Sequence, residues 1–274
     1  MKKTILLLTI GFLLCLSAYG QSFKQDFRVA LQAKDMVKAE EILKAWDFAD
    51  ANDPELYPSY FNFYTVKSQM ANGIIGGYDK ENSKKALEFI TEGIERYPTR
   101  FDMRMAKIYM LCEVEDYSAY TKEVVEMISY SKKIDNNWKG TGFSVINSPA
   151  KIFDEAILEF QEKLFAKNKT NLYQHIIKIS DEMIRAYPNN VQSRLNLSTI
   201  YAKMEKYDES MKALLAATKI EPTNAILYYN LAYVYNLKGD KDNAKKNYGL
   251  TIINAKGDEA ELKEAAKKKL EELK

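Results

Sequence analysis

Residues 196–201 read Asn-Leu-Ser-Thr-Ile-Tyr, and residues 230–235, which lie 34 positions further along the chain, read Asn-Leu-Ala-Tyr-Val-Tyr. Pro188 and Pro222 follow apolar-periodic stretches and are separated by the same interval. Large apolar side chains three or four positions apart share one face of a helix, and an intervening serine or alanine lets a second helix approach closely. The two stretches therefore predict two copies of a 34-residue helical unit.

The two units resemble the tetratricopeptide repeat (TPR) in residues beyond these hexapeptides. Asp208 and Asp242 match in the polar turn, and Ser210 and Ala244 match at the small position of the second helix. In this family each repeat is a helix pair that is apolar on two sides, so repeats must stack on one another. The resemblance implies an all-α fold, an α-α superhelix. We expect a TPR-like solenoid of about six helix pairs with a C-terminal capping helix.

Weaker forms of the pattern extend the prediction toward the N-terminus. Two stretches interrupt it, residues 73–82 and residues 134–148, and the second has no helical periodicity. Small and large residues occupy the expected second-helix positions of the first two pairs: Ala39, Leu43 and Trp46, then Ala86, Ile90 and Gly93. The predicted pairs are 22–53, 56–98, 101–133, 149–188, 191–222 and 225–256, with Ser148-Pro149 as the start of the fourth.

The last helix is expected to begin at Asp258. Its apolar residues form one stripe, and lysines and glutamates occupy the remaining faces. This pattern predicts that residues 258–274 form a helix that covers the open face of the sixth pair. A membrane-surface helix is the alternative, but the mixed charges and the lack of aromatic anchors argue against it. The stripe consists of Leu262, Ala266, Leu270 and Leu273.

Residues 1–20 have the order of a cleaved secretory signal. Two lysines precede an apolar run over 5–16, and small residues stand at Ala18 and Gly20. The run is well short of the roughly 20 residues that span a bilayer, which disfavours a membrane anchor. Lipidation at Cys15 is a second alternative, disfavoured by the bulky residues before it. We expect a signal peptide (1–20), a repeat domain (21–257) and the capping helix (258–274), in a protein exported to the periplasm or envelope.

Charge argues against nucleic acid as a partner. The chain has 40 Lys and Arg against 38 Asp and Glu, and Lys2 and Lys3 would leave with the signal peptide. A balanced chain lacks the basic excess with which proteins displace counterions from nucleic acid. No later apolar run approaches spanning length, so we expect no integral membrane segment after signal removal and a soluble mature chain.

Few residues suggest catalysis, a metal or a cofactor. His175 is the one histidine, and Cys112 is the one cysteine after the predicted signal. A zinc site would need further ligands, and a nucleophile would need a base and an orienting group. We interpret His175 as an ordinary helix residue and Cys112 as a small buried one. The prediction is a non-enzyme without cofactor or metal.

Trp138 stands out within residues 134–148 because Gly and Asn surround it. One hypothesis is that Trp138 and Phe143 anchor this loop to the helices. The other is that Trp138 is an exposed aromatic contact for a partner. The first is favoured.

The family resemblance also implies where a partner binds. TPR proteins usually hold a peptide in a concave groove lined by the first helix of each pair. Family members that clamp a terminal carboxylate use basic residues, whereas this chain has Leu195 and Thr199 at those places. We expect a protein or peptide partner held on a stripe rich in amides and aromatics, with the oligomeric state left open. Its residues are Gln192, Asn196, Thr199 and Lys203 in the fifth pair, with Tyr229, Asn230, Tyr233 and Asn236 in the sixth.

These expectations favour a binding scaffold of the bacterial periplasm or envelope. An accessory subunit of an envelope assembly or export complex is an alternative within that class. An enzyme on a helical solenoid is a further alternative. It would need a pocket with convergent titratable groups, for which the sequence has no motif.

Overall fold

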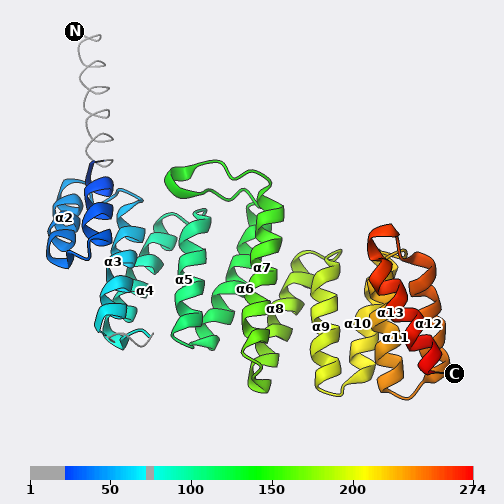
Figure 1. Ribbon diagram of the computed structural model, residues 1–274. Coiled ribbons are helices and arrows are strands. Elements are labelled where there is room, and N and C mark those ends of the chain that lie inside the picture. Colours follow the sequence, from blue (N-terminus) through cyan, green and yellow to red (C-terminus); the bar gives the residue numbers. More distant parts are fainter. Residues whose placement is uncertain (1–21, 72–76, 274) are drawn as a thin grey trace, which may run out of the picture. The chain divides into compact units, whose positions relative to one another are not determined.

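The computed structural model describes residues 22–71 and 77–273 (Figure 1). Within these residues the regular structure is helical, and the β-type pairing consists of two isolated bridges, both at Lys139. The all-α fold class is therefore confirmed. The predicted signal peptide, residues 1–20, lies outside the described residues.

The helix pairs follow the predicted order. The first pair contains helical residues 22–32 and α2, and five further pairs and a last helix follow within the described residues. Each of the described helices is too short or too polar to cross a bilayer. The bounds are α2 (Met36–Ala49), α3 (Leu56–Ala71), α4 (Lys80–Arg96), α5 (Phe101–Glu113), α6 (Tyr117–Lys133), α7 (Pro149–Ala166), α8 (Tyr173–Ala186), α9 (Val191–Lys203), α10 (Tyr207–Ile220), α11 (Ala225–Leu237), α12 (Lys241–Asn254) and α13 (Ala260–Glu272), with 3₁₀ turns η1 (Thr141–Phe143), η2 (Thr170–Leu172) and η3 (Gly257–Glu259).

The chain divides into two compact units, which we describe separately. Among the described residues, the first comprises 22–71, 77–123 and 133–151, and the second comprises 124–132 and 152–273.

The first unit has a core of apolar residues that the sequence pattern predicts. Ala39, Leu43 and Trp46 of α2 are fully buried, and Phe27 and Phe63 pack in the same cluster. Ala86 and Ile90 of α4 are buried in the next cluster. Gly93 lets α4 pack closely against α3, because a Cβ at this position would lie only 2.7 Å from the Cβ of Tyr57 on α3. The small-large-small pattern on α4 is thus confirmed as a packing pattern. The stretch predicted at 73–82 ends earlier, since Asp79 caps the start of α4.

The loop after α6 is anchored by Trp138, as the favoured hypothesis predicted. Its side chain is 1% exposed and meets Phe101 edge to face at 5.6 Å. The backbone of Lys139 donates to the carbonyl of Thr99 and accepts from the N–H of Phe101, each at 2.9 Å. Phe143 is the weaker anchor, packing against Tyr97 while staying partly exposed.

A buried ion cluster holds the tip of the same loop. Arg100 is fully buried and pairs with Glu55 at 2.7 Å and with Asp102 at 2.8 Å. Glu55 also accepts from the backbone N–H of Gly142 at 2.9 Å, and Asp102 accepts from the hydroxyl of Thr141 at 3.1 Å. Charges at this depth are stabilising only when each has partners, and here both carboxylates have several.

The second unit is built on the two repeats in which the sequence pattern is strongest. Ser198 and Ser210, the predicted small positions of the fifth pair, are buried and share a 2.8 Å hydrogen bond between α9 and α10. Leu214 on α10 and Leu227 on α11 are fully buried in the cluster that joins the fifth pair to the sixth. Burying one leucine contributes about 1.5–3 kcal/mol, so this cluster is a main source of stability.

The C-terminal helix covers the sixth pair, as predicted. Ala266 of α13 is fully buried against Ala232, Ala244 and Tyr248, with Leu270 and Leu273 packed around them. Burial raises the pKa of the Tyr248 hydroxyl to about 12. The stripe on α13 is therefore a packing surface inside the second unit.

Candidate functional site

Helix α9 presents the predicted binding residues of the fifth pair. Asn190 caps its start by accepting from the backbone N–H of Ser193 at 2.8 Å. Gln192, Thr199 and Lys203 are exposed, and Asn196 is half-buried. Their spacing of three or four residues places them along one side of the helix.

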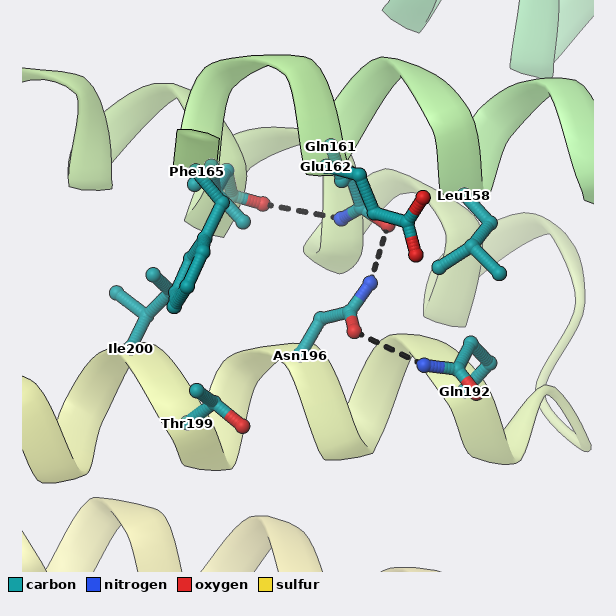
Figure 2. Close-up of a pocket in the computed structure, with 9 residues that line it drawn as sticks. Leu158, Gln161, Glu162, Phe165, Gln192, Asn196, Thr199 and Ile200 are labelled. Atoms are coloured by element: carbon teal, nitrogen blue, oxygen red, sulfur yellow. Dashed lines mark hydrogen bonds between the residues drawn. The ribbon is translucent and has the colours of Figure 1, made fainter. Parts of the chain in front are cut away.

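Three of these residues line a cavity of about 190 Å³, which we call cavity 1 (Figure 2). Its other walls come from α7 and α8. Most of its lining surface is apolar, while Glu162, Gln192 and Thr199 at its rim are exposed. The lining residues are Leu158, Gln161, Glu162, Phe165, Ile176, Gln192, Asn196, Thr199 and Ile200.

A chain of amide hydrogen bonds fixes the polar side of cavity 1 (Figure 2). Gln192 Nε2 donates to Asn196 Oδ1 at 3.0 Å, and Asn196 Nδ2 donates to Gln161 Oε1 at 2.6 Å. Gln161, 3% exposed, uses its Nε2 to donate to the hydroxyl of Ser180 at 2.6 Å. An amide fixed on both sides holds one orientation, so Asn196 is preorganised for contact with a ligand.

A second cavity of about 310 Å³, cavity 2, lies between α9 and α11. It contains four of the predicted residues. Thr199 lines both cavities, so they adjoin along α9. The lining residues of cavity 2 are Ser198, Thr199, Ala202, Lys203, Asn230, Tyr233, Val234 and Leu237.

The 34-residue period relates the linings of the two cavities. Leu158, Glu162 and Phe165 on α7 lie one period before Gln192, Asn196 and Thr199 on α9. Asn230, Tyr233 and Leu237 on α11 lie one period after Asn196, Thr199 and Lys203. Each cavity is thus formed between corresponding faces of the first helices of adjacent repeats. Counting the period one step back would have identified the α7 residues, which the sequence prediction omitted.

Two predicted residues line neither cavity. Tyr229 packs its ring against Tyr248 at 5.5 Å, in the cluster under α13. Asn236 is half-buried near the end of α11. The two cavities therefore bring together six of the eight predicted residues. Tyr229 is a packing residue because α13 closes over its neighbour Tyr248, a contact with no local signal in the sequence.

Two charged side chains of opposite sign lie near Phe165: Glu162 lines cavity 1, and Lys203 lines cavity 2. The carboxylate of Glu162 turns toward Leu158, away from Phe165 (Figure 2). The ammonium of Lys203 lies 5.0 Å from the centroid of Phe165. Because Phe165 forms a wall of cavity 1, the acid and the base stand toward different ends of it.

Other reactive side chains lie apart from these cavities. Cys112 is buried on α5, and His175 is partly buried on α8, where burial and then Lys178 lower its pKa. Within the described part of the chain, His, Cys, Asp and Glu side chains form no group of three that could hold a metal ion. The chemistry of the cavities is that of apolar contact and amide hydrogen bonding.

Comparison with known proteins supports the repeat. Residues 199–239 match the family model described as TPR repeat. No curated protein matches the chain. Among solved structures, a tetratricopeptide repeat protein from Parabacteroides merdae ATCC 43184 is similar, with a TM-score of 0.40, 15% identity and coverage of 93% of each chain.

Two further solved structures are similar at comparable levels. One is YrrB, described as a TPR protein with an unusual peptide-binding site, with a TM-score of 0.42, 16% identity and coverage of 82% of this chain and 97% of that one. The other is TTC0263, a thermophilic TPR protein in Thermus thermophilus, with a TM-score of 0.31, 13% identity and coverage of 90% of this chain and 97% of that one.

Proposed function

We propose that the chain is a tetratricopeptide-repeat protein and a non-enzymatic scaffold that binds a protein or peptide through cavities 1 and 2. The observation that carries the proposal is the adjacency of the two cavities. They share Thr199 and present apolar walls beside the amides of Asn196 and Asn230. Apolar pockets with a few fixed polar groups are the usual form of a recognition site.

The proposal includes a place of action in the bacterial periplasm or envelope. It is supported by the order of charged, apolar and small residues in positions 1–20. Intact-mass measurement of the protein from its native host tests this part. We expect a mature chain that begins at Gln21. A mass that retains residues 1–20, or acyl chains on Cys15, would contradict it.

Site-specific photocrosslinking in the native host tests the binding surface. A photoreactive amino acid at Thr199 or at Tyr233, both of which line the cavities, should capture the same partner. The matched control is the same substitution at Lys212, which is exposed on α10 and lines neither cavity. Equal capture from position 212, or none from positions 199 and 233, would refute the proposed surface.

A quadruple alanine variant tests whether the surface is required. We choose Gln192, Thr199, Lys203 and Tyr233 because each is exposed, so truncation leaves the core intact. Asn196 and Tyr229 are avoided because they contact Gln161 and Tyr248. We expect retained helicity and lost partner capture. The control replaces four exposed residues of α10 and α12, namely Glu209, Lys212, Lys219 and Lys246.

A further inference from the structure

Glu162 lines cavity 1, and Lys203 lines cavity 2 next to the Phe165 wall of cavity 1. Within residues 22–71 and 77–273, Glu162 and Lys203 form no ion pair, although nearby Glu159 on α7 pairs with Lys163 at 3.7 Å. The Lys203 ammonium instead contacts the ring of Phe165. Both charged groups are exposed and therefore available to a ligand.

The volume and walls of cavity 1 fit one large apolar side chain. The cavity measures about 190 Å³ and is lined by Leu158, Phe165, Ile176 and Ile200. An apolar cavity of roughly 150 Å³ in another protein accommodates benzene, so a phenyl ring or a branched aliphatic group is of the right size here. Phe165 is 38% exposed, so an incoming side chain would remove apolar surface from water.

The rim offers hydrogen bonds suited to a peptide backbone. An asparagine amide has two N–H donors and two acceptor positions. Asn196 uses one donor toward Gln161 and one acceptor position toward Gln192. One donor and one acceptor position therefore remain, the pair needed to bind the C=O and N–H of an extended segment.

We infer that cavity 1 recognises an extended peptide segment with one large apolar anchor, a basic residue on the Glu162 side and an acidic residue on the Lys203 side. This inference rests on the proposed function and specifies its ligand. Charge complementarity selects this ligand, because a peptide without charged residues would give neither Glu162 nor Lys203 a partner of opposite charge. Such rim charges determine specificity and register more than affinity.

A peptide-display library panned against the purified chain tests the inference. Enriched peptides should share a Phe, Leu, Ile, Met or Trp between a Lys or Arg and an Asp or Glu, in one constant order. Panning against Glu162→Lys should replace the basic residue of the motif by an acidic one. Panning against Lys203→Glu should replace the acidic residue by a basic one. The matched control, Glu209→Lys, makes the same charge change at an exposed site on α10 and should keep the wild-type motif.

Binding of one enriched peptide, measured by fluorescence anisotropy, gives the magnitudes. Replacing its apolar anchor by alanine should weaken binding by about 30-fold, as for a buried hot-spot residue. Removing either flanking charge should weaken it by about two- to fivefold, the range of exposed ion pairs. A peptide that carries an acidic residue in place of its basic one should recover that loss on Glu162→Lys.

The outcomes separate the inference from the proposed function. Two results would contradict the inference but not the proposed function. In the first, the peptides lose binding when the exposed residues of α9 and α11 are replaced but share no apolar anchor. In the second, the selected motif is unchanged by both charge reversals. If every selected peptide still binds the quadruple alanine variant, or if no peptide is selected, the proposed function is contradicted as well.

Discussion

Asn196 of α9 donates its side-chain amide to the buried Gln161 of α7 at 2.6 Å, so a predicted binding residue is also a link between two repeats. Gln161 in turn donates to Ser180 on α8. The rim of cavity 1 is therefore continuous with the buried polar contacts of the second unit. Changes beneath the cavity should affect binding without touching the ligand.

Gln161→Leu should destabilise the second unit by about 1–3 kcal/mol, because it leaves the buried Ser180 hydroxyl and the Asn196 amide without their partner. Thermal unfolding followed by circular dichroism measures this change. Gln192→Leu is the control. It removes an exposed member of the same chain of amides and should change stability by less than about 0.5 kcal/mol. Equal effects of the two changes would contradict the role given to Gln161.

Arg100→Met should destabilise the first unit by about 3–5 kcal/mol, since it removes the charge that Glu55 and Asp102 share in the interior. Arg96→Met is the matched control. Arg96 pairs with Glu92 on the surface of α4, and exposed pairs of this kind contribute about 0–1 kcal/mol. Hydrogen exchange should locate the loss at the tip of the loop, where Glu55 of this cluster accepts from the backbone N–H of Gly142.

The Glu55 carboxylate should make the same loop sensitive to acid. Burial alone would raise its pKa, but the hydrogen bond from Lys24, the charge of Arg100 and the N–H of Gly142 outweigh burial and lower the pKa below the ordinary 4.5. A lowered folded-state pKa stabilises the protein above about pH 4.5, and this contribution is lost as the pH falls through the folded-state value.

Glu55→Gln therefore should lower the protection factor of the Gly142 amide at pH 7 and flatten its decline below about pH 4.5. Exchange measured by mass spectrometry across that range, corrected for intrinsic rates, checks this. Glu81→Gln is the control, because Glu81 lies exposed at the start of α4. An unchanged acid decline in Glu55→Gln would show that another group controls the loop.

Helix pairs were predictable because the 34-residue period repeats a packing requirement. Ser198, Ser210, Ala232 and Ala244 are buried where the pattern put small residues. The partners of Glu55 were not predictable in this way. Arg100 and Gly142 are far from it in sequence, and no spacing relates an irregular loop to a helix start. Local periodicity specifies which faces pack, and long-range loop contacts follow only once the helices are stacked.

The candidate site was predicted only in part. The family resemblance implied Thr199, Lys203, Asn230 and Tyr233, which meet at cavity 2. It missed Gln161, because a glutamine on an amphipathic helix gives no sign that it is buried. Its burial depends on Ser180 and Asn196, which lie on the two following helices.

Trp138→Ala should lower the melting temperature of the first unit, with a loss of about 3–5 kcal/mol expected for truncating a buried tryptophan. Phe143→Ala should cost clearly less, because Phe143 is partly exposed. Comparing the two variants shows whether the loop is anchored by the buried side chain of Trp138 or equally by any aromatic side chain in the loop. A Trp138→Ala protein with wild-type stability would contradict the anchoring role, whatever its binding.

Gly93→Ala and Gly249→Ala should have opposite signs although both add one methyl group to a helix. Alanine is favoured over glycine in a helix interior by roughly 0.5–1 kcal/mol. At Gly249 on α12 the new Cβ meets no atom within 4 Å, so stability should rise by about that amount. At Gly93 the Cβ would lie 2.7 Å from Tyr57 Cβ and 3.1 Å from Met103 Sδ, both within the packed core.

Overpacking of this kind costs about 1–3 kcal/mol, which exceeds the helix-propensity gain, so Gly93→Ala should be destabilising. Urea unfolding of the two variants beside the wild type measures both changes. The double variant should show their sum, because the two sites lie in different units and share no partner. Stabilisation by Gly93→Ala would show that α3 and α4 are not packed as closely as the structure has them.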